Sequence, residues 1–225
     1  MIPLKLIDRA LTPDKSGELQ LHQRGADFFI LLDGKELMSS RKHGSEEALA
    51  ELACAPIAGR AKARVLVGGL GMGYTLAAAL SVLQEDASVI VAELVPEVVN
   101  WNRSVLGALA GNPLDDNRVE VQERDVCILL QNVRGGFDAV MLDVDNNPRS
   151  MTQKSNAWLY SDTGLSSIRL ALKSQGVLTV WGAAPDSAFS LRLRKAGFTV
   201  QEKTVSARGC GKGGRHTIWV ATRPA

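Results

Sequence analysis

The sequence predicts an α/β fold in which a mostly parallel sheet alternates with helices, preceded by a small β extension. Two observations predict it. From about residue 64 onward, apolar runs alternate with segments of helical spacing, whereas the first 40 residues contain short extended pieces without helical periodicity. Strand–helix alternation is typical of βαβ units and a parallel sheet. At 225 residues the chain can hold one such core and a small extension. We therefore predict an extension over residues 1–40 and a main domain over 41–225.

The extension is predicted to consist of short strands at residues 17–23, 26–32 and 35–38. Asp33-Gly34, between the last two, is a strong hairpin-turn signal. A helix should follow, with Ser45 as its N-cap and with Pro56 and Gly59 after its end.

The main domain shows the alternation clearly. Five apolar runs are predicted as strands, at 64–68, 88–93, 119–122, 137–143 and 176–181. Helices between them are predicted from apolar residues that recur every three or four positions: Leu76/Leu80/Leu83, Val98/Trp101/Val105, Leu165/Ile168/Leu172 and Phe189/Leu193/Ala196. Two further runs, 198–203 and 217–221, are joined by a glycine-rich turn and predict a terminal antiparallel hairpin.

Bulk properties exclude several functional classes. Hydrophobic residues make up 45% and charged residues 22%, the balance of a globular protein, and the net charge is only +2. So small a net charge does not favour binding to nucleic acid or to an anionic membrane. The three cysteines fit no zinc pattern or disulfide framework, so no metal site is predicted and a cytoplasmic location is expected. Glycines interrupt the one long uncharged stretch, 65–83, so no membrane span is expected.

A glycine-rich turn, Val65-Leu-Val-Gly-Gly-Leu-Gly-Met-Gly-Tyr74, runs from a predicted strand into a predicted helix. Glycines there let the backbone approach a ligand, and the helix start offers free N–H groups. Gly69, Gly71 and Gly73 are therefore candidate cofactor-binding residues. The dinucleotide fingerprint GxGxxG fails because Tyr74 takes its third glycine position, and the phosphate loop GxxxxGK[ST] is absent.

Two acidic residues follow the next two strands. Glu93 ends the second strand, 20 residues after Gly73, where a carboxylate can accept hydrogen bonds from both ribose hydroxyls of an adenosine. The alternative is a solvated loop acid. Asp125 follows the third strand and could meet the adenine amino group, or could instead cap the helix predicted at 126–131.

Asp143 and Asp145 lie at the carboxyl end of the fourth strand, in the crevice where open α/β sheets bind ligands. Two neighbouring carboxylates could orient an acceptor or take its proton, because their mutual repulsion raises one pKa. Asp145 with Asn146 could instead simply build a turn. Asp143 and Asp145 are the candidate catalytic residues.

In this order, the motifs resemble the spermidine synthase branch of the class I S-adenosylmethionine-dependent methyltransferase superfamily. The resemblance covers about residues 28–222 and implies a Rossmann-like, seven-stranded sheet whose last strand is antiparallel. It also implies that Glu93 binds ribose, Asp125 binds adenine and Asp143 acts as base near an acceptor amine, and it implies a homodimer. It rests on Leu32-Asp33-Gly34, the helix after it, Gly68-Gly69, Glu93, Asn117-Arg118-Val119 before Asp125, Phe137-Asp138 leading to Asp143, Leu159-Tyr160-Ser161 and 172–176.

The departures concern the substrate side. Where the family has the loop GGGDGG, this chain has Gly71 in place of the Asp. Where the family has DSSDP, this chain has Asn146 in place of the second Asp. The family's Tyr-Gln-Glu segment aligns with residues 46–48, which are Glu-Glu-Ala in this chain, and an earlier Gln of the family aligns with Leu37. In that family the loop Asp pairs with the terminal ammonium of a decarboxylated donor.

We therefore expect a group-transfer enzyme that uses S-adenosylmethionine with its carboxylate intact and methylates a small-molecule acceptor. The alternatives are an aminopropyltransferase using decarboxylated S-adenosylmethionine and a non-catalytic nucleoside-binding module. The basic turn 208–216 suggests nucleic-acid modification as a further possible function, but a pI near 8.5 is not basic enough to favour it. That turn could instead close over an anionic acceptor or be a solvated loop.

Overall fold

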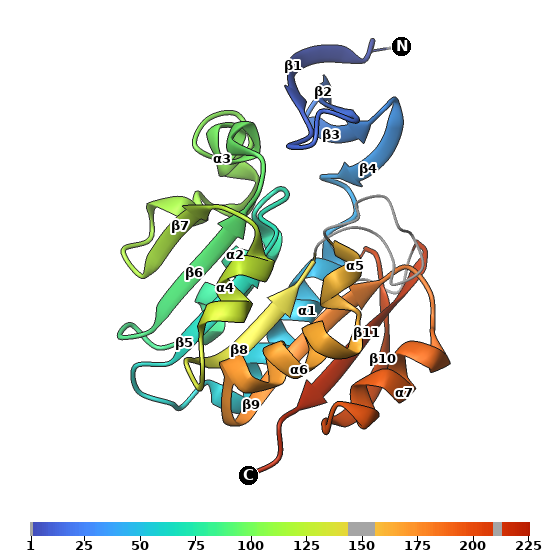
Figure 1. Ribbon diagram of the computed structural model, residues 1–225. Coiled ribbons are helices and arrows are strands. Elements are labelled where there is room, and N and C mark those ends of the chain that lie inside the picture. Colours follow the sequence, from blue (N-terminus) through green and yellow to red (C-terminus); the bar gives the residue numbers. More distant parts are fainter. Residues whose placement is uncertain (1, 144–155, 209–212) are drawn as a thin grey trace.

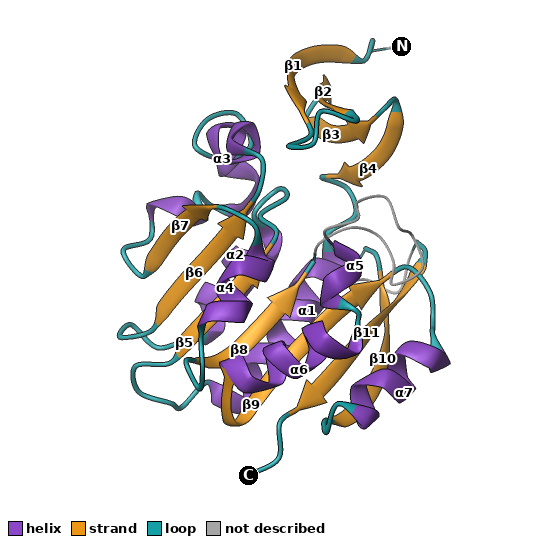
Figure 2. Cartoon of the chain, in the orientation of Figure 1, coloured by secondary structure: helices purple, strands orange, loops and turns teal. Residues whose placement is uncertain are grey.

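The computed structural model describes residues 2–143, 156–208 and 213–225 (Figure 1). It contains a four-stranded antiparallel sheet, formed by the N-terminal residues, and a seven-stranded mixed sheet flanked by helices (Figure 2). The α/β fold, its seven strands and the separate N-terminal sheet are thus confirmed.

The N-terminal sheet has the strand order β1-β2-β3-β4. Its strands are β1 (Lys5–Leu11), β2 (Glu18–Arg24), β3 (Asp27–Leu32) and β4 (Lys35–Ser39). Asp33 and Gly34 join β3 to β4 with φ of 49° and 78°, and Leu32 pairs with Lys35. Positive φ at both central residues is the geometry that the predicted Asp-Gly turn requires.

The main sheet has the order β10-β11-β9-β8-β5-β6-β7. Its inner strands are parallel, and β11 pairs antiparallel with both β9 and β10, which confirms the terminal hairpin. The strands are β5 (Arg64–Gly68), β6 (Ser88–Glu93), β7 (Val119–Glu123), β8 (Phe137–Leu142), β9 (Leu172–Gly182), β10 (Thr199–Ser206) and β11 (Arg215–Thr222).

Helices cover both faces of this sheet (Figure 2). Alternate strand residues point to opposite faces. Val65 and Val67 of β5 therefore join the core that includes α1 and α2, and Leu66 joins the core under α4 and α6. The α-helices are α1 (Gly44–Cys54), α2 (Tyr74–Val82), α3 (Pro96–Asn102), α4 (Val126–Asn132), α5 (Asn156–Leu159), α6 (Asp162–Ala171) and α7 (Ser187–Lys195). Single 3₁₀ turns lie at Ala55–Ile57, Gly107–Ala110 and Pro113–Asp115.

Three local predictions were wrong. Ser45 is not the N-cap of α1, because the helix already begins at Gly44 and the Ser45 hydroxyl donates to Glu46 Oε2 at 2.6 Å. Val105 is 45% exposed, because α3 ends at Asn102 and the helical spacing stops there. Leu172 begins β9 instead of closing α6, so this strand starts four residues earlier than expected.

The N-terminal sheet packs against the main domain and is held over the carboxyl ends of the central strands (Figure 1). Buried Leu21 and Ile30 share one core with Val95 and Trp101. The Trp101 indole Nε1 also donates to Asp8 Oδ2 at 2.8 Å. Within the described ranges, no helix is both long and apolar enough to cross a membrane.

Candidate functional site

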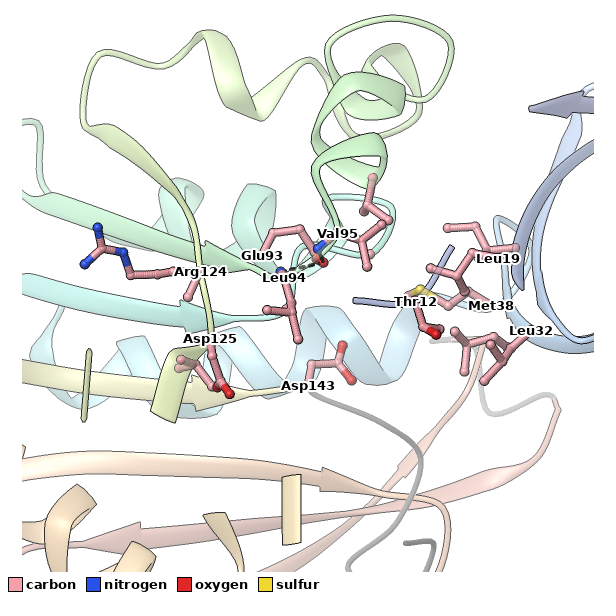
Figure 3. Close-up of a pocket in the computed structure, with 17 residues that line it drawn as sticks. Thr12, Leu19, Leu32, Met38, Glu93, Leu94, Val95, Arg124, Asp125 and Asp143 are labelled. Carbon is pink, nitrogen blue, oxygen red and sulfur yellow. Dashed lines mark hydrogen bonds between the residues drawn. The ribbon is translucent and has the colours of Figure 1, made fainter. Parts of the chain in front are cut away.

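A cavity lies where the N-terminal sheet meets the carboxyl ends of β5, β6 and β8 (Figure 3). Its polar lining residues are Thr12, Glu93, Arg124, Asp125 and Asp143. Its wall toward the N-terminal sheet is apolar and consists of Leu19, Ile30, Leu32, Leu37 and Met38. The position matches the crevice at which open α/β sheets bind ligands.

The glycine loop between β5 and α2 forms the floor of the cavity. Gly69, Gly71 and Gly73 have φ of 91°, 54° and 84°, in the left-handed region that side chains disfavour. Asn102 Nδ2 holds the loop by donating to the Gly71 carbonyl at 2.8 Å. Gly69 and Gly71 line the cavity, whereas Gly73 is the N-cap of α2 and is not among the lining residues.

Gly71 is also closely covered. A Cβ built on it would lie 2.7 Å from Met38 Cε and 2.8 Å from Met38 Sδ. Real side chains do not approach this closely, so Met38 occupies the space that a larger residue at position 71 would need. The sequence shows a glycine at position 71, but only the structure shows that Met38 fills the space beside it.

Glu93 is buried at the end of β6, with 8% of its surface exposed. Its Oε2 accepts from Leu70 N at 2.9 Å, and its Oε1 accepts from Leu94 N at 2.8 Å and from Val95 N at 2.9 Å. The carboxylate therefore ties the glycine loop to the start of α3.

Asp125 caps a helix, the alternative role predicted for it, and also lines the cavity. It is the N-cap of α4, and its Oδ1 accepts from Cys127 N at 2.8 Å. Burial, reinforced by Asp125, raises the pKa of the Cys127 thiol to about 12. Cys127 is thus not a thiolate nucleophile near neutral pH.

Asp143 follows β8 and lies between Asp125 and the apolar wall in Figure 3. Its backbone N donates to the Gly68 carbonyl at 3.0 Å, which fixes its place beside β5. Thr75 Oγ1 lies 3.4 Å from Asp143 Oδ2. Its predicted partner Asp145 lies outside the described residues.

The charge in the cavity is predominantly negative. Three carboxylates, Glu93, Asp125 and Asp143, line it, and Arg124 is the one cationic residue among the described lining residues. Figure 3 shows the Arg124 guanidinium pointing away from Asp143 and from the apolar wall. This arrangement suits a positively charged ligand. In the part of the chain that the structure describes, no group of His, Cys, Asp and Glu side chains is placed to hold a metal ion.

A second polar cluster surrounds the start of α1. His216 Nδ1 lies 2.9 Å from Ser45 Oγ, and burial followed by the charge of Lys42 lowers the His216 pKa. Burial raises the pKa of Glu46, the neighbour of Ser45. His43 stacks on Tyr74 with ring centroids 4.3 Å apart. These residues are not among those that line the cavity.

The basic turn is described only in part. Arg208 and Arg215 are exposed, and Arg215 is the first residue of β11. Lys212 lies outside the described residues, so closure of this turn over an acceptor stays a prediction.

Five of the residues predicted from the sequence, Gly69, Gly71, Glu93, Asp125 and Asp143, line one cavity. Their roles in binding and catalysis stay predictions. The apolar wall was missed. The run at 26–32 was predicted as a strand, but no local pattern shows which side chains of an antiparallel sheet will face a distant cavity.

Comparison with known structures agrees with this geometry. A spermidine synthase from Thermotoga maritima superposes with a TM-score of 0.76 at 18% identity, covering 97% of this chain and 73% of that chain. A spermidine synthase in complex with the transition-state analogue AdoDATO gives a TM-score of 0.78 at 18% identity, covering 97% and 74%. A probable spermidine synthase from Corynebacterium glutamicum gives 0.68 at 12% identity, covering 96% and 79%. At these identities the similarity shows the fold.

Comparison of the sequence gives the family. No curated protein matched the sequence. The model of the spermine/spermidine synthase domain matches residues 43–187, which is more than half of the chain and includes the glycine loop, Glu93, Asp125 and Asp143. This match confirms the resemblance inferred from the motifs and the expectation of an enzyme. The chain belongs to the spermine/spermidine synthase family of transferases.

Proposed function

We propose that the protein transfers an aminopropyl group from decarboxylated S-adenosylmethionine to an amine acceptor. The observation that carries the proposal is the acidic cavity at the strand ends, in a chain of this family. Decarboxylated S-adenosylmethionine carries a sulfonium and an ammonium group and no carboxylate. Three carboxylates and a single outward-pointing arginine favour such a donor over one that brings its own negative charge.

The roles of the residues follow from their positions. Glu93 would accept a hydrogen bond from a ribose hydroxyl, and Asp125 would accept one from the adenine amino group. Gly69 and Gly71 would let the donor lie against the backbone of the loop. The residues present fit a nucleoside donor, because the glycine backbone and the two acids face one cavity.

The transfer itself is a displacement at carbon. The acceptor nitrogen would attack the aminopropyl carbon that is bonded to the sulfonium. A new C–N bond would form as the bond between that carbon and sulfur breaks, with its electron pair remaining on sulfur. The products are an N-alkylated amine and 5′-methylthioadenosine. The amine must be neutral to attack and loses a proton on bonding, and Asp143 would orient it and accept the proton.

Methyl transfer from S-adenosylmethionine, the function favoured by the sequence reasoning, is the second candidate. One observation favours it. Gly71 offers no carboxylate for a donor ammonium, and the thioether of Met38 fills that space. The match to the spermine/spermidine synthase family favours aminopropyl transfer instead.

Calorimetric titration with both donors, followed by turnover with a mixture of amines, tests the proposal. We expect tighter binding of the decarboxylated donor and release of 5′-methylthioadenosine, quantified by liquid chromatography and mass spectrometry. Release of S-adenosylhomocysteine instead would replace aminopropyl transfer by methyl transfer. Donor binding without consumption of either donor would indicate the non-catalytic nucleoside-binding module. Asp143→Asn provides a control that should bind donor without turnover.

A further inference from the structure

Asn102, the last residue of α3, reaches the glycine loop from behind, because it is not among the described residues that line the cavity. It is 3% exposed. Its Nδ2 donates to the Gly71 carbonyl at 2.8 Å and to the Val98 carbonyl at 2.9 Å. Since both partners can only accept, they fix which end of the amide faces the loop. The side chain is therefore held in one orientation between helix and loop.

The position of Asn102 does not depend on the loop. Its bond to Val98 runs one turn back along α3 and keeps the side chain against its own helix. On the other side, a Cβ built on Gly107 would lie 2.5 Å from the Asn102 carbonyl oxygen, so the following 3₁₀ turn packs directly on the backbone of Asn102. The Gly71 carbonyl thus meets a donor that its own surroundings hold in place.

Gly73 also contacts Asn102. A Cβ built on Gly73 would lie 3.0 Å from Asn102 Oδ1, an atom that has no hydrogen-bond partner among the described residues. With a φ of 84°, position 73 disfavours a side chain in any case. Gly73 was predicted to bind a cofactor and does not line the cavity. Its conformation and its closeness to Asn102 give a different reason for a glycine there.

The loop is tied to both ends of α3 at two successive residues. Leu70 N donates to Glu93, which also accepts from Val95 N at the start of the helix, and the Gly71 carbonyl accepts from Asn102 at its end. Glycine backbone is conformationally permissive, so without the Asn102 bond the peptide after Gly71 would be free to rotate. When only a fraction of the molecules holds the binding conformation, apparent affinity falls by that fraction.

We propose that Asn102 is a positioning residue for donor binding, which holds the Gly71 peptide in the conformation against which the nucleoside donor lies. This inference rests on the proposed function in one respect, that the cavity binds such a donor. Loss of one buried amide–carbonyl bond shifts a local equilibrium by about three- to tenfold, and donor affinity should fall by the same factor. Transfer at saturating donor should persist, because Asn102 does not line the cavity.

Asn102→Ala and Asn102→Asp test the proposal. The aspartate keeps the shape of the side chain but replaces the donating Nδ2 with an oxygen. With decarboxylated S-adenosylmethionine and a fixed mixture of amines, the donor KM should rise about three- to tenfold while kcat stays within about twofold. Partial unfolding alone would lower kcat and leave KM unchanged. An unchanged donor KM in both folded variants would overturn the inference.

Ser190→Ala is the matched control. Ser190 lies on α7, is 1% exposed and accepts from Trp219 Nε1 at 2.8 Å, so the variant also loses a buried hydrogen bond. Ser190 is not among the described residues that line the cavity. Urea unfolding should show a comparable loss of stability, yet the donor KM should not change. An equal rise in donor KM in Ser190→Ala would show that lost stability is the cause and would contradict the inference.

Measurements without turnover separate this inference from the proposed function. Amide hydrogen exchange across residues 70–73, followed by NMR without ligand, should be about three- to tenfold faster in Asn102→Ala. The calorimetric Kd for 5′-methylthioadenosine should rise by a similar factor. If this Kd rises while no amine is alkylated by either protein, aminopropyl transfer is wrong but the role of Asn102 stands. If exchange in the loop is unchanged, Asn102 does not position it, whatever group the enzyme transfers.

Discussion

The thioether of Met38, on the N-terminal sheet, fills the position that a side chain on Gly71 of the glycine loop would take. A Cβ on residue 71 would come within 2.7 Å of Met38 Cε. The two residues are 33 positions apart in sequence, yet a side chain at position 71 would require the end of Met38 to move. The space beside the glycine loop is thus filled by the N-terminal sheet, and we expect both residues to influence the choice of donor.

Gly71→Asp should shift donor preference toward decarboxylated S-adenosylmethionine by about tenfold, because a charge-assisted hydrogen bond to the donor ammonium would form and a donor carboxylate would be repelled. The variant should also lose about 1–2 kcal/mol of stability, since φ is 54° and the end of Met38 must move. Combining it with Met38→Ala should relieve the contact. Calorimetry with both donors and urea unfolding measure these effects. Gly71→Ala is the control for backbone strain, and the same shift in that variant would exclude the charge as the cause.

Glu93→Ala should weaken donor binding about ten- to a hundredfold, because it removes a charged acceptor from the nucleoside site. It should also lower the melting temperature, since three backbone N–H groups lose their acceptor. Glu123→Ala is a matched control, because Glu123 is the exposed residue paired with Glu93 across β6 and β7. Unchanged donor affinity in folded Glu93→Ala would remove Glu93 from the binding site.

Asp143→Asn should keep donor affinity within about threefold and lose about 10²-fold or more in turnover, because the amide cannot accept the acceptor's proton. Single-turnover measurements with saturating donor isolate the transfer step. Thr75→Val is a useful comparison, since Thr75 Oγ1 lies 3.4 Å from Asp143 Oδ2 and its loss should have a smaller effect. Full turnover in Asp143→Asn would return Asp143 to a structural role.

Asp138 should make stability depend on acid pH. Asp138 is 3% exposed, and burial alone would raise its pKa. Its carboxylate accepts hydrogen bonds from Arg64 N at 2.8 Å, Lys173 Nζ at 2.6 Å and Arg60 Nη1 at 3.0 Å. These hydrogen bonds outweigh burial and hold the pKa of Asp138 below its usual value. The unfolded chain then binds the proton more tightly. The stabilisation is complete above about pH 4 and is lost as pH falls through the folded pKa.

Asp138→Asn should therefore cost about 2–4 kcal/mol near neutral pH and flatten the acid limb of a urea-unfolding profile measured from pH 3 to 7. Asp116→Asn, which removes a more exposed ion pair with Arg118, should cost less. An acid limb identical to that of the wild-type protein would show that Asp138 is not its source.

Much of the fold could be predicted from local patterns. Strand positions, the Asp33-Gly34 turn and the terminal hairpin depend on periodicity and turn chemistry, which each segment carries by itself. The errors lie at element ends. Val105 continued an apolar spacing beyond the last turn of its helix, and Leu172 was assigned to a helix although the β9 ladder pairs it with Phe137. Where a helix ends or a strand begins depends on partners far away in the sequence.

The sequence by itself determined the strand-end acids and the glycine loop, because parallel strands place their carboxyl ends at one edge of a sheet and thereby bring Glu93, Asp125 and Asp143 together. Only the tertiary structure decided what faces them. The position of the N-terminal sheet depends on long-range contacts such as Trp101 with Asp8, and these set Leu32, Leu37 and Met38 against the acids. An antiparallel strand has two faces, and only packing selects which of them lines a site.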